Sequence, residues 1–340
     1  MTVGVTLQRL VAENTAAGPE LFPDSWALTK LRLPQIDSRI QTLNRGTDRQ
    51  SVFVEYKPFD KEPSATFIER MKRLAKLLSV PGVSEKGFNT LQCIGVIRQD
   101  SPSKRFVFVF QFPAKIPGPT LTLDTVPIDL ATAISSNNIK RPTLGQKFKI
   151  ARALTETIFQ LHSVNWLHKS IRSENVLFCR QSGIVNYENP YLVGFEFSRD
   201  EKDRSTTEQD DILARNVFRH PDRHGPPEER FTSLHDIYAL GVTLLEIGIW
   251  RPILGFDKFE QKTPAEIKEC LESHTRERLP HYMGTAYMIA VLHCLQGTLI
   301  ESGKSKNAIG MPWGDAEREQ VQMALREKVV GNIDNGNALE

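Results

Sequence analysis

The chain has 340 residues, of which 40% are hydrophobic and 25% are charged, and its formal net charge is +2. This length and composition are typical of a globular protein with a large core, and the near-neutral charge gives no reason to expect nucleic acid or an anionic membrane as a main partner. The four cysteines are far apart in the chain and no apolar run approaches the roughly 20 residues that span a bilayer, so we expect reduced thiols in a cytoplasmic protein.

Residues 1–45 show no sustained periodicity and are interpreted as an N-terminal extension. The β-branched and aromatic run at residues 51–56 predicts a strand. Apolar residues at helical spacing over 64–80 predict the helix that follows it. Two more runs, 88–98 and 105–112, are rich in apolar and aromatic residues and predict two further strands.

These elements make a small β-rich lobe of residues 46–112, followed by a larger helical lobe of residues 113–300. Residues 301–340 are expected to form a loop and a C-terminal helix, with a frayed end at 332–340. Helical patterns cover 128–136, 143–164, 234–249, 263–273, 282–297 and 314–330, and short strands are predicted at 175–179 and 191–197.

The polar loop after the 143–164 helix carries a motif. His168, Lys169 and Ser170 are followed by four residues and then by Asn175, at the start of a short apolar strand. This layout resembles the catalytic loop of the eukaryotic protein-kinase fold, whose pattern is His-Arg-Asp, four residues and Asn. The resemblance implies an α+β fold with two lobes, a small β-rich N-terminal lobe and a larger helical C-terminal lobe.

The resemblance also implies a damaged catalytic loop. Ser170 stands where the family has its catalytic Asp, and a neutral hydroxyl is a poor proton acceptor. Arg172 keeps a positive charge where active members have a phosphate-contacting Lys. Asn175 matches the Asn that holds a magnesium ion in active members, or else it bonds the loop backbone. His168 is expected to pack and to form hydrogen bonds, not to act as a base.

The second expected site is the Asp-Phe-Gly triplet, whose Asp holds magnesium in the family. The corresponding residues are Gly194, Phe195 and Glu196. Gly194 offers no carboxylate, Phe195 keeps the apolar anchor, and Glu196 is a remaining candidate ligand that is out of register. We therefore expect no metal site, or magnesium binding that is weak and uses Asn175 and Glu196.

The nucleotide site is only partly retained. Lys57 matches the family's Lys that pairs with the nucleotide phosphates and with a Glu of the following helix, for which Glu69 is the first candidate and Glu62 the second. Residues 31–50 contain no Gly-x-Gly pattern, so a phosphate-cradling loop is not expected. ATP binding is left open.

The structural motifs are better preserved. Asp236 matches a buried Asp that hydrogen-bonds the catalytic-loop backbone, and Gly241 permits close packing. The run 219–253 and the loop together resemble the kinase-like domains of fungal proteins that often carry an N-terminal HeLo domain, a helical membrane-targeting cell-death module. The resemblance covers about residues 50–300. The residues before it are too few for such a bundle, so we expect no direct membrane insertion.

The sequence therefore favours a catalytically impaired kinase-like domain, a pseudokinase, that acts as a regulatory or interaction module with protein partners in the cytoplasm of a fungal cell. The alternative is a weak or atypical ATP-dependent Ser/Thr protein kinase that uses Lys57, Arg172, Asn175 and Glu196. A third possibility is a domain that binds no nucleotide, in which Lys57 and Glu69 do not pair.

Overall fold

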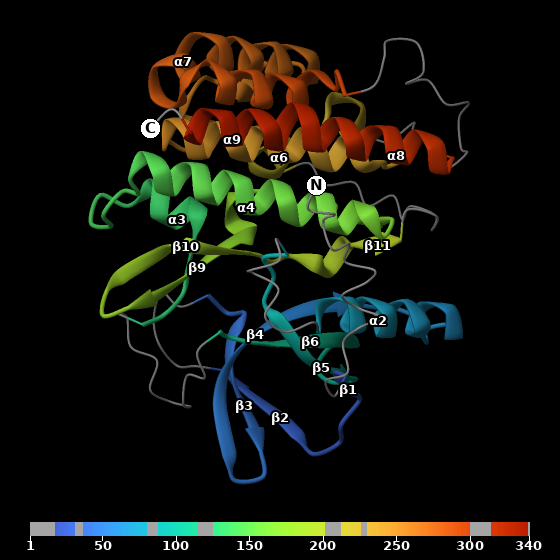
Figure 1. Ribbon diagram of the computed structural model, residues 1–340. Coiled ribbons are helices and arrows are strands. Elements are labelled where there is room, and N and C mark those ends of the chain that lie inside the picture. The colour runs from blue at the N-terminus through green and yellow to red at the C-terminus, as the bar shows by residue number, and fades with distance from the viewer. Residues whose placement is uncertain are drawn as a thin grey trace.

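The computed structural model describes residues 18–30, 37–79, 88–113, 125–200, 212–225, 230–299 and 314–338. The N-terminal part is rich in β-sheet and the C-terminal part is helical, which gives the mixed α+β architecture that the sequence predicts (Figure 1). Within these residues, no helix is both long enough and apolar enough to cross a membrane.

A six-stranded sheet forms the N-terminal part, in the order β1-β5-β6-β4-β3-β2. β1 pairs with β5 in parallel, and the other neighbours pair antiparallel. The strands are β1 (Glu20–Leu21), β2 (Trp26–Lys30), β3 (Ile40–Arg45), β4 (Asp48–Pro58), β5 (Gln92–Gln99) and β6 (Arg105–Gln111).

The two faces of β4 have different partners, because successive side chains of a strand point to opposite faces. Val52 and Val54 lie in a small apolar cluster on one face. Phe53 lies on the other face, in the main core to which α2 (Ala65–Leu78) also contributes. Glu55 follows Phe53 at a spacing of two, so the alternation places it on the core face.

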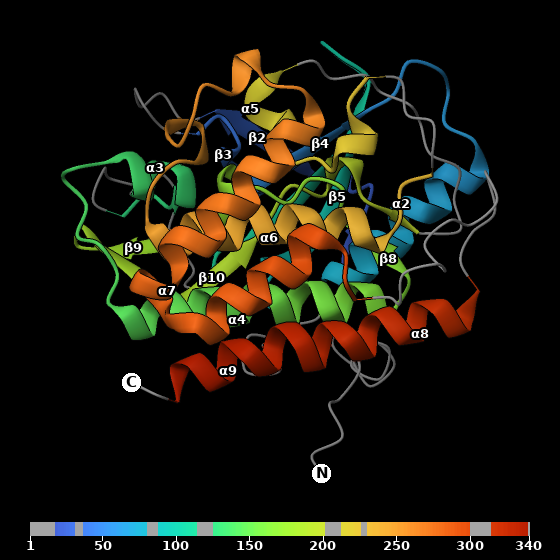
Figure 2. The ribbon, with the colours of Figure 1, turned by 90° about the horizontal axis from the view of Figure 1, so that it is seen from above.

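The helical part is built around α6 (Ser233–Ile249), in which almost every residue is buried. In Figure 1, α6 lies between α4 (Leu144–Ser163) and α7 (Pro264–Gln296). Figure 2 shows that α8 (Asp315–Ala324) and α9 (Gly331–Asn337) run along α4, with the π-helical segment Leu325–Val330 between them.

Smaller elements lie between the sheet and the helices (Figure 1). One three-stranded sheet has the order β10-β9-β7, and β8 pairs with β11. These elements are β7 (Ile128–Asp129), α3 (Leu130–Ser135), β8 (Trp166–Leu167), β9 (Val176–Gln181), β10 (Ile184–Leu192) and β11 (Arg199–Asp200). Short helical turns complete the chain: Ser173–Asn175, Phe195–Phe197, α5 (Leu213–Asn216), Pro221–Arg223, Ile253–Gly255 and Phe259–Gln261.

The N-terminal boundary that we predicted is wrong. The sequence pattern assigns residues 1–45 to an extension outside a lobe that begins at residue 46, but β1, β2 and β3 belong to the sheet. β3 is polar in sequence apart from Ile40 and Leu43, so it lacks the apolar run that marks a strand. Its register against β4, from Ile40 opposite Phe53 to Arg45 opposite Asp48, holds it in the sheet.

The predicted helices 263–273 and 282–297 correspond to the two helical parts of α7, but the first part continues beyond residue 273 and the break lies at Gly284, where the backbone is non-helical (φ 77°, ψ 168°). The intervening residues look polar, yet Thr275 and Leu279 keep the helical spacing and are buried. The predicted strand 191–197 ends earlier, because β10 stops at Leu192 and Phe195–Phe197 form a 3-10 turn.

The C-terminal residues are also more ordered than the sequence suggests. The pattern predicts fraying over residues 332–340, but α9 extends to Asn337. Ile333 is fully buried, and Asp334 Oδ1 lies 2.7 Å from Arg152 Nε on α4. The single apolar residue Ile333 therefore anchors a polar helix to the core.

Replacing Ile333 with Ala should lower the free energy of unfolding by about 2–4 kcal/mol, because it leaves a cavity under α9. Denaturant unfolding would measure the loss. The control is Asn335→Ala on the exposed side of the same helix, for which we expect a change within about 0.5 kcal/mol. Equal effects of the two substitutions would contradict the docking of α9.

Candidate functional site

The loop at residues 168–175 is held by a buried carboxylate from α6. Asp236 is 1% exposed and accepts the backbone N–H groups of His168 at 2.7 Å and of Lys169 at 2.8 Å. His162 Nε2 lies 3.2 Å from the same carboxylate. Burial opposes ionisation of this group, but the bond to His162 and the surrounding donors outweigh it and lower the pKa of Asp236. The contact expected between Asp236 and the loop is present.

Ser170 is engaged inside the loop. Its hydroxyl oxygen lies 2.5 Å from Arg172 Nη1 and 3.1 Å from Asn175 Nδ2, both of which donate to it. Asn175 Nδ2 also donates to the Ser170 carbonyl at 2.8 Å. In the described part of the chain, no carboxylate or imidazole is hydrogen-bonded to the Ser170 hydroxyl. Ser170 is therefore an acceptor that shapes the loop, without a base that would make it reactive.

His168 has a packing role. Its ring meets Phe195 edge-on, with centroids 4.7 Å apart, and Nδ1 accepts the Ser170 N–H at 3.2 Å. Burial lowers the pKa of His168 to about 4, so the ring is neutral at pH 7. These contacts match the role that we expected for His168 and Phe195.

The side chain of Asn175 packs directly against Gly194. Gly194 has φ 93°, a left-handed conformation that side chains rarely adopt. A Cβ built at this position would lie 2.2 Å from Asn175 Nδ2 and 2.4 Å from Asn175 Cγ. The Asn175 amide thus fills the space into which a side chain at residue 194 would point, and any such side chain would force the amide to move.

The sheet reaches this site through two residues that sequence reasoning missed. Glu55 of β4 accepts the N–H groups of Gly194 at 2.5 Å and of Phe195 at 2.6 Å, one on each carboxylate oxygen. Arg39, just before β3, donates to Asn175 Oδ1 at 3.2 Å and to the Glu174 carbonyl at 3.3 Å. We call these four contacts the cross-brace, because they tie the sheet to the helical part.

The cross-brace contains buried charge. Glu55 is 3% exposed, and its pKa is raised to about 7 by burial and then by the Glu196 carboxylate, against the lowering effect of its two N–H donors. The Arg39 guanidinium is close enough to Asp37, Glu55 and Glu196 that its pKa is raised in spite of burial. Opposite charges therefore face one another across the site.

The predicted nucleotide pair is not assembled. Lys57 Nζ donates to the Ser198 carbonyl at 3.1 Å, whereas the exposed Glu69 lies 4.0 Å from Lys72 Nζ. Glu62, the second candidate, forms an ion pair with Arg98 at 2.8 Å. Both predicted partners of Lys57 thus have other cations beside them.

The residues present fit magnesium poorly. Asn175 Oδ1 accepts from the Arg39 guanidinium, which would repel a cation. The Glu55 oxygens are already used by two N–H groups, and Gly194 has no ligand atom. Glu196 lies near Glu55, Arg39 and Arg172, and two further carboxylates, Asp37 and Glu174, form ion pairs with these arginines. Magnesium usually needs several oxygen ligands in near-octahedral order.

Gly241 has the structural role that we expected. A Cβ at this position on α6 would lie 2.7 Å from the Cys294 Cβ on α7. The absent side chain lets α6 and α7 approach closely.

One signal could have revealed Glu55. It interrupts the apolar run of β4 on the same face as Phe53, where a carboxylate needs a partner to be buried. Arg39 offered no comparable signal, because its contacts lie 135 and 136 residues away in sequence.

Replacing Gly194 with Ala should lower the free energy of unfolding by about 2–4 kcal/mol, because strain from the left-handed backbone adds to the clash with Asn175. Gly46→Ala is a matched control, since Gly46 has φ 58° and, among the described residues, no atom within 4 Å of the point where a Cβ would lie. The control substitution should lower the free energy of unfolding by only about 1–2 kcal/mol. Equal losses in denaturant unfolding would show that Asn175 does not fill this space.

Glu55 should make stability depend on pH. Its pKa is higher in the folded state than in the unfolded chain, so its contribution is fully present below about pH 4.5 and is lost as the pH rises through about 7. As the pH rises between those limits, the free energy of unfolding of Glu55→Gln should increase by up to about 3 kcal/mol relative to that of the wild type. Unfolding curves across this range would measure the difference.

A control is needed because Glu246, on α6, is also buried with a pKa raised to about 7. Glu55→Gln should keep the part of the pH dependence that belongs to Glu246, and Glu246→Gln should keep the part that belongs to Glu55. Parallel pH profiles for wild type and Glu55→Gln would contradict the assignment.

Residues 118–338 match a family described as a domain of unknown function, DUF7580. The match includes the 168–175 loop, Gly194 and α6, but it excludes Arg39 and Glu55. No curated protein matches the chain.

Proposed function

We propose that this chain, which belongs to the DUF7580 family, is a catalytically impaired protein-kinase-like domain that works as a regulatory or interaction module. The observation that carries the proposal is the cross-brace. Asn175 and the backbone of Gly194 and Phe195, the places where the kinase resemblance expects metal and nucleotide chemistry, are bonded to Arg39 and Glu55 of the protein itself.

Three chemical requirements of phosphoryl transfer are poorly met. Among the described residues, no base is hydrogen-bonded to the Ser170 hydroxyl, and loss of a positioned base typically slows a reaction by about 10²- to 10⁴-fold. Gly194 supplies no metal ligand, and restoring a carboxylate would displace Asn175. The Glu196 carboxylate, and Glu55 in its ionised form, also disfavour the anionic phosphates of a nucleotide close to the loop.

The contacts of the cross-brace are suited to a conformational switch. The cross-brace joins the sheet to the loop, and its members use few bonds to do so: two from Arg39 and two from Glu55. A protein partner that binds the braced arrangement better than a released one would shift the balance between them by its difference in affinity. Protonation of Glu55 near neutral pH would act on the same contacts.

The biological setting of the proposal follows from the resemblance to fungal kinase-like domains. A chain of this type would act in the cytoplasm of a fungal cell and bind one or more proteins there. The resemblance places such domains next to membrane-targeting death modules, so a partner carrying one is the first class of protein to consider.

A thermal-shift titration with ATP tests the proposal. A ligand at about 100 times its dissociation constant stabilises the native state by about 2.7 kcal/mol, which raises the melting temperature by a few degrees. We expect no magnesium- or manganese-dependent shift, because the metal ligands are missing or engaged. A shift without metal would fit a pseudokinase that binds nucleotide.

Two variants make the result specific. Lys57→Ala removes the candidate phosphate-binding cation, and Lys72→Ala removes an exposed lysine from the neighbouring helix as a matched control. A metal-dependent shift that Lys57→Ala abolishes and Lys72→Ala leaves intact would overturn the proposal in favour of an active kinase.

A further inference from the structure

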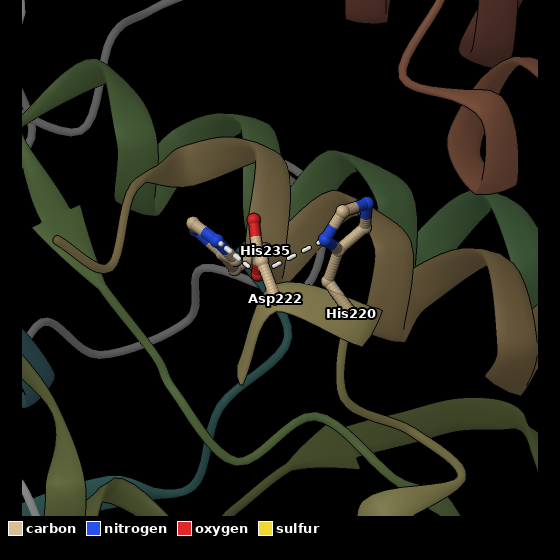
Figure 3. A group of neighbouring side chains, drawn as sticks. All are labelled: His220, Asp222 and His235. Carbon is tan, nitrogen blue, oxygen red and sulfur yellow. Dashed lines mark hydrogen bonds and ion pairs between the residues drawn. The ribbon is translucent and has the colours of Figure 1, made fainter. Parts of the chain in front are cut away.

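Two histidines converge on one carboxylate away from the cross-brace. Figure 3 shows the rings of His220 and His235 on either side of Asp222. His220 Nδ1 and His235 Nε2 each lie 3.0 Å from the same oxygen, Asp222 Oδ1. His220 and Asp222 come from the turn at Pro221–Arg223, and His235 comes from the first turns of α6.

We propose that His220, Asp222 and His235 form a binding site for a divalent transition-metal ion, with Zn²⁺ as the best match. Their donor atoms all lie within 4.8 Å of one another. Two imidazoles and one carboxylate are a donor set that zinc accepts, with a further position left for water or another ligand. The proposal does not depend on the proposed function.

The His220 ring gives an independent reason. Its Nδ1 is inaccessible to solvent and has no partner with hydrogen-bond geometry, although Asp222 Oδ1 is 3.0 Å away. A buried polar atom without a hydrogen bond is uncommon in native proteins and is often explained by an ion or a water molecule. A metal between the three residues would give Nδ1 a ligand bond.

On its other side, His235 Nδ1 faces both a donor and a hydroxyl of Thr232. The Thr232 N–H donates to His235 Nδ1 at 2.8 Å, and Thr232 Oγ1 lies 3.0 Å from the same nitrogen. When Nε2 binds a metal through its lone pair, the ring proton moves to Nδ1 and is donated to Thr232 Oγ1. The Thr232 N–H then loses its acceptor on His235, and the Thr232 hydroxyl orients the ring as outer-shell partners of ligating histidines do.

The rings are positioned before any metal arrives. His220 packs edge-on against Tyr238 at 5.1 Å, and His235 packs against Phe231 at 4.9 Å. Two cations, Lys169 and Arg223, lie over the Phe231 ring. A metal ion must therefore be bound by direct ligation to the imidazole nitrogens and not by net negative charge. Nitrogen ligands favour Zn²⁺ over Mg²⁺ and Ca²⁺, which prefer oxygen.

The test is a Zn²⁺ titration of the full chain after removal of metal with a chelator, read by competition with a chromophoric chelator. We expect one strong site, with no competition by Mg²⁺ or Ca²⁺. His220→Gln and Asp222→Asn each remove a ligand at a partly exposed position and should weaken that site by at least about 100-fold, more than loss of an outer-shell partner costs.

A second cluster on the same chain supplies the control. Asp257, Cys270 and His274 also have donor atoms within 4.8 Å, but Lys262 Nζ lies 3.3 Å from Asp257 Oδ2 and competes with a metal there. His274→Gln should leave the strong site unchanged.

The outcomes are distinct. Loss of affinity in His220→Gln and Asp222→Asn, but not in His274→Gln, supports the site, provided that circular dichroism shows folded variants. Since the substitutions are independent, either folded variant decides the result. The proposal is overturned if wild type binds no Zn²⁺, if Mg²⁺ competes equally, if both substitutions leave affinity intact, or if His274→Gln removes the site.

Discussion

The carboxylate of Asp236 is the interaction on which the arrangement of the site depends. It lies inside the most buried helix of the described chain and accepts two backbone N–H groups from the loop that carries Ser170 and Asn175. A buried charge without such donors would be costly, so the loop and the helix stabilise each other. With the loop fixed, Asn175 meets Gly194, and the backbone at Gly194 is then presented to Glu55.

Two side chains of the site, Asn175 and Glu55, have hydrogen-bond partners within the protein for both of their polar atoms. The Asn175 amide bonds Ser170 through its nitrogen and Arg39 through its oxygen, so both ends of one side chain have partners. The Glu55 carboxylate likewise meets one N–H with each oxygen. Such a network specifies one relative placement of the sheet and the helices, because a shift of either part would leave buried polar atoms unpaired.

The sequence was informative where local patterns decide the structure. The helices α2, α4 and α6 follow from apolar spacing and from caps such as Ser64 and Thr143, and the contact of Asp236 with the loop followed from the motif. β3 and the end of α9 were missed because pairing and packing, not their own composition, hold them in place. The Lys57–Glu69 pair was expected from the kinase resemblance, but Lys57 donates to the Ser198 carbonyl and Glu69 lies beside Lys72.

The position of the cross-brace relative to the family match has a practical meaning. Arg39 and Glu55 lie before residue 118, where the match to DUF7580 begins, whereas all four of the groups that they bind lie after it. A fragment trimmed to the matched residues would leave two amide protons and two oxygens of its central loop without their acceptors and donors. Conclusions about ligand binding drawn from such a fragment would describe a loop without the partners that Arg39 and Glu55 provide in the intact chain.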